Sequence, residues 1–260
     1  MPLFYDQLKR PVNVPSPPKR IISVVPSQTE LLFYLGLDAE IIGITKFCIH
    51  PEHQFNTKTK IGGTKQLNIN LIKSLQPDLI IANKEENEQS QIEELAKHFP
   101  VWISDINDLP GALDMIMKIA QVVTLEQEAE ELITAIKEQF EVLHINLSPL
   151  KAAYLIWRKP YMAAGKDTFI DSMLQNCGLT NVLTAQRYPE LTADELAAAN
   201  PGIVLLSSEP YPFTNKHIDE LQAILPAAKI IVVDGEIFSW YGSRLLQAPA
   251  YFGQLMERLA

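Results

Sequence analysis

The sequence predicts an α/β fold of two Rossmann-like three-layer lobes joined by a single long α-helix. First, apolar strands alternate with amphipathic helices before the helix predicted at 124–145, and the alternation resumes after Pro149. Second, the 124–145 segment contains no Gly or Pro, and its apolar residues recur at helical spacing. Third, 74–95 and 197–221 share one order: helix end, proline, apolar strand, acidic tip, helix. Chance resemblance between βα units is the alternative to a duplicated architecture.

The N-terminal part predicts an arm followed by the first lobe. Residues 1–19 are rich in proline and predict an extended arm, and the first lobe spans 20–123. RIISVV at 20–25 is a β-branched run typical of a buried parallel strand. Ser27 and Glu30 have the spacing of a capping box for the next helix. Further on, the pattern predicts strands at 40–45, 78–83 and 100–105, helices at 68–75, 88–98 and 109–123, and a long loop after residue 45.

The connecting helix is predicted at 124–146. Thr124 suits the N-cap position, and Gln127 would complete a capping box. Glu126 and Glu128 place negative charge in the first turn, where the helix dipole favours it. The pattern therefore predicts a rigid connector between two similar halves.

The second lobe is predicted at 147–245, and a C-terminal helix at 246–260. Thr192 and Glu195 form another capping-box pattern. Gly178 is placed to end a helix. The lobe is expected to contain strands at 151–157, 202–208 and 229–235, helices at 167–178, 192–200 and 217–225, and a short segment at 181–183.

The composition excludes several classes of function. The chain has 260 residues and a net charge of −9, and it has no run of Lys and Arg such as a nucleic-acid binder carries. No apolar run is long enough for a membrane span. Its two cysteines, Cys48 and Cys177, predict no disulfide framework. The common hydrolase, P-loop and dinucleotide motifs are absent, so we expect a protein without catalysis or an intrinsic cofactor. We also expect it to be a monomer.

The candidate ligand site lies at the carboxyl ends of the strands, where open α/β sheets bind ligands. Aromatic rings there suit a large flat ligand, and interleaved cationic groups suit its anionic edges. Packing between the lobes is the alternative explanation for these rings. The candidate ligand-binding residues are Lys84, Trp157, Arg158, Tyr161, Arg187, Tyr188, Phe238, Trp240, Tyr241 and Arg244.

Two further groups of residues are candidates for metal coordination and for docking of a partner. Cys48 and His50 combine a soft and an imidazole ligand, so they could coordinate a metal held in a chelate. A loop with one partly buried cysteine is the alternative. Glu85, Glu86 and Glu209 lie at corresponding strand tips of the two lobes, which suggests a two-point dock for a basic partner. Solvated surface charge is the alternative for these carboxylates.

The chain resembles a known family through several stretches. They are RIISVVPSQTELLFYLGL, LQPDLIIANKEEN, the 124–145 helix, AAGKDTFIDSMLQNCGLTNVL and ELTADELAAANPGIVLLSSEP. Together they resemble the substrate-binding proteins of ABC importers that carry vitamin B12 and ferric siderophores. The resemblance extends from about Arg20 to Leu259, and it implies the helical-backbone type of metal-chelate receptor.

The resemblance implies a binding function. A corrinoid such as cobalamin, or a ferric siderophore, would occupy the cleft between the lobes. ABC permease subunits would dock on one glutamate per lobe, here Glu85 or Glu86 and Glu209. The implied location is the periplasm or cell envelope. No export signal is visible in the first twenty residues, which leaves a cytoplasmic location open.

Two alternatives remain at this point. The first is a cytoplasmic cofactor-handling protein or enzyme that acts on a tetrapyrrole-like ligand and coordinates its metal through Cys48 and His50. The second is a partner-binding scaffold whose cleft is filled by its own side chains.

Overall fold

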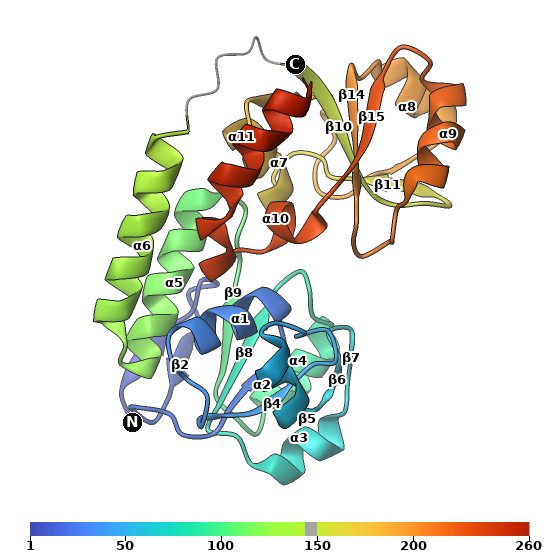
Figure 1. Cartoon of the computed structure of the whole chain (residues 1–260). Coiled ribbons are helices and arrows are strands. Elements are labelled where there is room, and N and C mark those ends of the chain that lie inside the picture. The colour runs from blue at the N-terminus through green and yellow to red at the C-terminus, as the bar shows by residue number, and fades with distance from the viewer. Residues whose placement is uncertain (144–149, 260) are drawn as a thin grey trace. The chain divides into compact units, whose positions relative to one another are not determined.

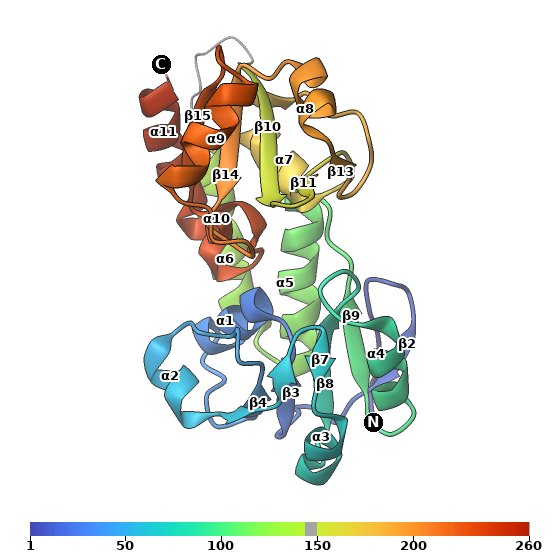
Figure 2. The same cartoon turned by 90° about the vertical axis from the view of Figure 1, so that its right-hand side faces the viewer.

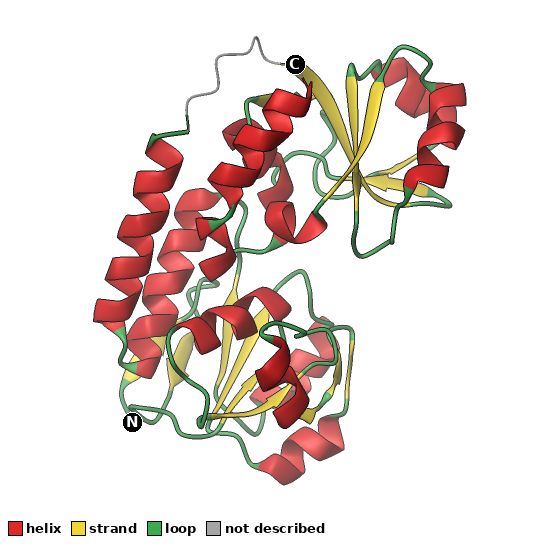
Figure 3. Ribbon diagram, viewed as in Figure 1, coloured by secondary structure: helices red, strands yellow, loops and turns green. Residues whose placement is uncertain are grey.

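The computed structural model describes residues 1–143 and 150–259, in two compact units (Figure 1). Each unit alternates helices with strands (Figure 3). The first unit comprises Met1–Ile106, Pro110–Ala135 and Tyr241–Arg244, and the second comprises Asn107–Leu109, Ile136–Trp240 and Leu245–Ala260.

The predicted N-terminal arm contains a short antiparallel hairpin of β1 (Leu3–Tyr5) and β2 (Pro11–Asn13). The arm then contacts β9 (Val101–Ser104), the edge strand of the first sheet. The backbone N–H of Gln7 donates to the Ile103 carbonyl at 3.1 Å, and Arg10 Nη2 donates to the Val101 carbonyl at 3.1 Å. The arm therefore satisfies part of an edge that would otherwise be open to another chain.

The first unit is built on a five-stranded parallel sheet with the order β5-β4-β3-β8-β9. Two of its three inner strands, β3 and β8, are buried along their whole length. The predicted strand at 20–25 is shorter in the structure. The strands are β3 (Ile21–Ser23), β4 (Ile41–Ile44), β5 (Thr59–Lys60), β8 (Leu79–Asn83) and β9.

The first helix differs from the prediction. Helix α1 spans Pro26–Tyr34 with Val25 at the N-cap and no side-chain cap. Pro26 fits the first turn because its missing N–H has no partner to lose there. Ser27 is therefore inside the helix, and the predicted capping box with Glu30 is wrong.

The remaining helices of the first unit follow the prediction more closely. Asn68 caps α3 by accepting from the Leu71 N–H at 3.1 Å. The long loop predicted after residue 45 contains structure of its own. The elements are α2 (Glu52–Thr57), the hairpin of β6 (Gly62–Gly63) and β7 (Gln66–Leu67), α3 (Ile69–Leu75) and α4 (Gln89–Ala96).

The predicted connector starts later than expected. Helix α5 (Leu109–Val123) ends before Thr124, which has a left-handed φ of 61°, and α6 covers Glu126–Glu141. Thr124 Oγ1 donates to the Val123 carbonyl at 2.7 Å, so Thr124 ends one helix instead of capping the next. The predicted end of this helix at 146 lies outside the described residues. None of the helices in the described ranges has the length and apolarity needed to cross a bilayer.

The second unit is built on a six-stranded mixed sheet. Its central strand β10 (Leu150–Trp157) pairs in parallel with β14 (Ile203–Ser207) and with β12 (Leu179–Asn181), and antiparallel with β11 (Tyr161–Ala163). The sheet is completed by β15 (Lys229–Val233), parallel to β14, and by β13 (Glu190–Leu191), antiparallel to β11.

Helices cover both faces of this sheet, as Figures 1 and 2 show. Ala153 and Leu155 pack under the helices of one face, and Tyr154 between them packs with Phe238 on the other. The capping box of Thr192 and Glu195 is confirmed. One face carries α8 (Ala193–Ala199) and α9 (Asn215–Ile224), and the other carries α7 (Phe169–Asn176), α10 (Gly235–Ser239) and α11 (Ala248–Leu259).

Candidate functional site

A buried amide network holds the turn that follows β8 in the first unit. Asn83 Nδ2 donates to Ser104 Oγ at 2.9 Å, and the Asn83 N–H donates to Asn87 Oδ1 at 2.8 Å. Asn83 Oδ1 in turn accepts from the backbone N–H groups of Glu85 and Glu86, at 2.8 and 3.0 Å. Because each amide is buried and bonded, the backbone of 83–87 has one defined conformation.

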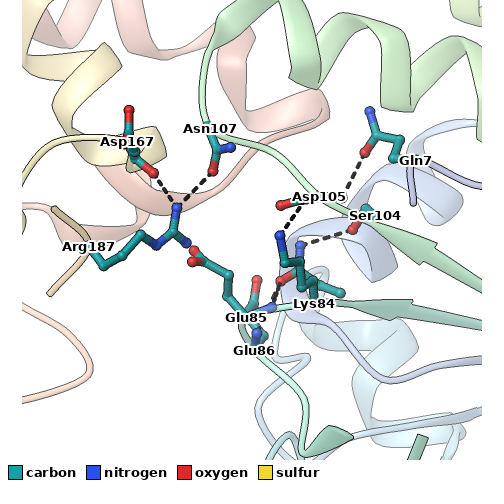
Figure 4. Close-up of polar contacts among 10 residues, drawn as sticks. Gln7, Lys84, Glu85, Glu86, Ser104, Asp105, Asn107, Asp167 and Arg187 are labelled. Atoms are coloured by element: carbon teal, nitrogen blue, oxygen red, sulfur yellow. Dashed lines mark hydrogen bonds and ion pairs between the residues drawn. The ribbon is translucent and has the colours of Figure 1, made fainter. Parts of the chain in front are cut away.

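That turn presents the candidate residues Lys84, Glu85 and Glu86 (Figure 4). Lys84 Nζ lies 2.7 Å from Asp105 Oδ2, so the predicted ligand-binding cation is engaged in an ion pair. Glu86 Oε1 accepts from the Tyr241 hydroxyl at 2.6 Å. Tyr241 is itself buried, and its polar group is directed at a candidate docking carboxylate.

The segment Tyr241–Arg244 belongs to the first unit. Arg244 donates from Nε and Nη2 to the two oxygens of Glu30, at 3.0 and 2.6 Å, and its side chain is only 10% exposed. A bidentate pair of this kind fixes both side chains. The Arg244 guanidinium joins this segment to α1 through Glu30, and its contact with anionic ligand groups stays a prediction.

Cys48 is buried in the core of the first unit. The Thr29 hydroxyl lies 3.1 Å from the Cys48 Sγ, and the Thr45 hydroxyl is at the same distance. Burial raises the pKa of the thiol to about 11, which disfavours the thiolate that binds metals. Cys48 is thus more deeply buried than the partly buried cysteine of the alternative interpretation, and His50 is partly exposed. The described residues contain no cluster of three or more His, Cys, Asp or Glu arranged to hold a metal ion.

Two apolar side chains flank Cys48 in the same loop. Phe47 is 51% exposed and Ile49 is 44% exposed, and the Lys46 ammonium lies 5.1 Å from the Phe47 ring centroid. Phe47 was not among the predicted ligand-binding residues. Its position directly after a parallel strand was the signal that could have identified it.

At the edge of the second unit, Glu209 follows β14 and is partly buried. Its Oε1 accepts from Trp240 Nε1 at 2.8 Å and from the Ser239 hydroxyl at 3.2 Å. Burial raises the pKa of Glu209 above its ordinary value, and these two hydrogen bonds oppose the rise. The candidate docking carboxylate is therefore held by a candidate ligand ring.

Phe238 belongs to the core. Its ring is fully buried, with centroids 5.1 Å from Tyr154 and 5.0 Å from Phe252. The Phe238 ring therefore has no exposed face in the structure, and Trp240 is also nearly buried. Both follow from α10, a helix that the sequence analysis missed, because it turns these rings inward.

Arg158 and Tyr161 share a carboxylate. Arg158 forms a bidentate pair with Glu220 through Nε, at 3.0 Å, and Nη2. The Tyr161 hydroxyl donates to Glu220 Oε1 at 2.9 Å. The bond from Arg158 contributes most to holding the pKa of Glu220 below its usual range, and burial raises the pKa of Tyr161 to about 12. These two candidates are thus joined in one polar cluster.

Trp157 is the most exposed of the candidate rings. It is 42% exposed and meets Tyr211 edge-to-face, with ring centroids 5.5 Å apart. Tyr211 also contacts the Phe213 ring at 4.7 Å. This arrangement holds an accessible indole on a rigid aromatic base.

Arg187 and Tyr188 lie beside each other in the second unit, with the guanidinium carbon 5.9 Å from the Tyr188 centroid. Arg187 Nη1 donates to Asn107 Oδ1 at 3.1 Å and to the Asp167 carbonyl (Figure 4). Arg187 has a left-handed φ of 61°, and Asp167 has one of 58°. Non-glycine residues in this region are uncommon and cluster at functional sites.

A hollow of about 560 Å³ opens at the carboxyl ends of β14 and β15. Its lining combines the strand ends with carboxylates and is made by Ser208, Glu209, Val232, Val233, Asp234 and Glu236. The arrangement offers hydrogen-bond acceptors and negative charge, which suit recognition of a basic group.

Comparison with known proteins places this fold in a family. The sequence profile of the Periplasmic binding protein family matches residues 21–229. A vitamin B12-binding protein of Pectobacterium atrosepticum is 24% identical over 258 residues, which cover 94% of this chain and 89% of that protein.

Solved structures show the same architecture. The periplasmic heme-binding protein of Roseiflexus sp. RS-1 is 21% identical, with a TM-score of 0.80 over 92% of this chain and 98% of that one. The periplasmic vitamin B12-binding protein of Vibrio cholerae is 20% identical, with a TM-score of 0.79 over 94% and 98%. The match of the profile over most of the chain shows that this protein belongs to the periplasmic binding protein family.

Proposed function

We propose that this protein is the substrate-binding protein of an ABC importer and that its ligand is a metal chelate, first of all a corrinoid such as cobalamin. The main observation that supports this proposal is the similarity to a vitamin B12-binding protein along nearly the whole of both chains. Ferric siderophores are the second candidate ligand, and the heme-binding neighbour adds heme to the classes to be tested. Family membership offers no support for a cytoplasmic cofactor-handling protein, and it favours the periplasm or cell envelope.

Three side chains are our main candidates for ligand contact. Trp157 and Phe47 offer exposed ring surface, and Tyr188 is partly exposed beside the Arg187 guanidinium. Rings of this kind stack on the flat face of a corrin or porphyrin. The chelate is cargo, so the chain needs no metal ligand of its own in order to bind it. Membership in a family of binding proteins supports the expectation that the chain catalyses no reaction.

The test is calorimetric titration of the purified protein with cyanocobalamin, hemin and ferrichrome. We expect cyanocobalamin to bind with a dissociation constant of about 1 μM or lower, equivalent to about 8 kcal/mol. Trp157→Ala should weaken binding roughly tenfold, the value of one stacked ring. Trp102→Phe is the matched control, because Trp102 is buried in β9. Failure of all three chelates to bind the wild-type protein would refute the proposal.

A further inference from the structure

Two neighbouring aromatic residues each donate a hydrogen bond to a candidate docking carboxylate. In the second unit, Trp240 Nε1 lies 2.8 Å from Glu209 Oε1. In the first unit, the Tyr241 hydroxyl lies 2.6 Å from Glu86 Oε1. Trp240 and Tyr241 are consecutive in the chain, and the division between the units falls between them. One short segment thus supplies a donor to a strand-tip glutamate in each unit.

The contact to Glu209 is selective for one oxygen. Trp240 Nε1 and the Ser239 hydroxyl both donate to Oε1, and among the described residues no hydrogen bond to Oε2 is found. A glutamate side chain ordered in this way has already lost much of its rotamer entropy. A partner that binds the ordered carboxylate avoids that cost.

A glycine at the start of α10 leaves space for the hydrogen bonds to Glu209. A Cβ on Gly235 would lie 2.7 Å from Glu209 Cγ and 2.4 Å from Ser207 Oγ. Only glycine therefore lets α10 approach the Glu209 side chain closely. Because Ser239 ends α10 and Trp240 is its C-cap, this approach brings both donors to the carboxylate.

We propose that Trp240, assisted by Ser239, and Tyr241 are positioning residues that orient Glu209 and Glu86 toward basic side chains of the permease. This inference rests on the proposed function, because it assumes that the two glutamates dock on an importer. A guanidinium or ammonium group is the complementary partner, since it donates to a carboxylate and carries the opposite charge. The rings of Trp240 and Tyr241 thus act through the glutamates, and their polar atoms carry the effect.

Variants that remove only the donor test this role. Tyr241→Phe keeps the ring and removes the hydroxyl, and Trp240→Phe removes the indole N–H. Trp102→Phe is the matched control for the second change, because Trp102 Nε1 is buried without a hydrogen-bond partner in the structure. Tyr5→Phe is the control for the first change, because Tyr5 is 58% exposed. Glu209→Gln and Glu86→Gln define the loss of each carboxylate charge.

The first measurement is independent of any permease. Carbon-detected NMR of the glutamate carboxyls follows the titration of Glu209 in wild type and variants. Burial, together with Glu236 and Asp234, raises the pKa of Glu209, and the bonds from Trp240 and Ser239 lower it. Trp240→Phe should therefore raise this pKa further, whereas Trp102→Phe should leave it unchanged. An unchanged Glu209 titration in Trp240→Phe would refute the positioning role of Trp240.

The second measurement is docking on the host's permease complex in lipid nanodiscs by biolayer interferometry. We expect Trp240→Phe and Tyr241→Phe each to weaken docking about tenfold, the value of one hydrogen bond to a charged group. Circular dichroism checks that both variants and both controls are folded. Docking at the wild-type level in both variants would overturn the inference, even if the wild-type protein binds a chelate. If no chelate binds but the Glu209 titration shifts, the proposed function fails and the positioning of this carboxylate stands.

Discussion

The two units stabilise the carboxyl edges of their sheets by different chemistry. In the first unit, neutral amides and hydroxyls of Asn83, Asn87 and Ser104 form a buried network. In the second unit, aromatic side chains are the donors. The Tyr154 hydroxyl donates to Ser207 at 3.0 Å, and Trp240 donates to Glu209, which is titratable. A neutral network keeps its hydrogen bonds at every physiological pH, whereas a partly buried carboxylate responds to pH. The same architecture can therefore present loops that differ in their sensitivity to protons.

The largest effect is expected from removing the aromatic support of the second edge. Phe238→Ala leaves a cavity between Tyr154 and Phe252 and should lower the free energy of unfolding by about 3–5 kcal/mol. Urea denaturation measures it. Trp157→Ala is the comparison, because this exposed ring should cost less than about 1 kcal/mol. Equal losses in the two variants would contradict the assignment of Phe238 to the core.

The amide network of the first edge should rank second. Asn83→Ala removes the Nδ2 bond to Ser104 and the acceptor for two backbone N–H groups, so it should cost about 2–4 kcal/mol. This loss should be the same at pH 5 and pH 8, because the network contains no titratable group. Asn70→Ala, at an exposed position of α3, should stay within about 0.5 kcal/mol of wild type. A strongly pH-dependent loss in Asn83→Ala would break the comparison between the two edges.

A glycine pair tests the close approach of α10 in the second unit. A Cβ at position 235 would overlap Ser207 Oγ and Glu209 Cγ, so Gly235→Ala should destabilise by about 1–3 kcal/mol. A Cβ at Gly253, inside α11, meets no atom within 4 Å. Gly253→Ala should therefore stabilise by about 0.5–1 kcal/mol through helix propensity. Thermal unfolding of both variants gives the result, and a neutral Gly235→Ala would show that α10 can move away from β14.

The smallest effect concerns the titration of Glu209. Because burial raises its pKa, the folded state binds this proton more tightly than the unfolded chain. The stabilisation is complete below the unfolded pKa of about 4.3 and is lost as the pH rises through the folded pKa. Glu209→Gln should therefore be more stable than wild type at pH 7, with the difference vanishing toward pH 4. Stability curves between pH 4 and pH 8 decide this, and a lower stability of the variant at pH 7 would reverse the sign of the argument.

Local patterns predicted the fold because they are carried by neighbouring residues. The apolar β-branched runs became β3, β8 and β14, and the family profile agrees with the resemblance seen in the motifs. The capping patterns were less reliable. Thr192 caps its helix as predicted, whereas Thr124 adopts a left-handed conformation and ends the helix before it. The same capping-box spacing thus occurs in two different backbone conformations.

The candidate ligand-binding residues show more clearly what the sequence alone could not predict. Their positions near strand ends followed from the sequence, but their partners are remote: Arg244 binds Glu30, and Arg158 binds Glu220. Phe238 looked like a strand-tip ring until α10 turned it into the core. No local pattern indicates partners that lie 214 and 62 residues away in the sequence.

By itself, the sequence determined the alternation of strands and helices, the absence of common enzyme motifs and the family resemblance, because these depend on periodicity and short spacings. Only the tertiary structure decided which rings are buried, which cations are already paired and which donors reach Glu209 and Glu86. The physical reason is that burial and hydrogen bonding are set by atoms brought together from distant segments. The chemistry available at each strand tip therefore becomes defined only when the chain is folded.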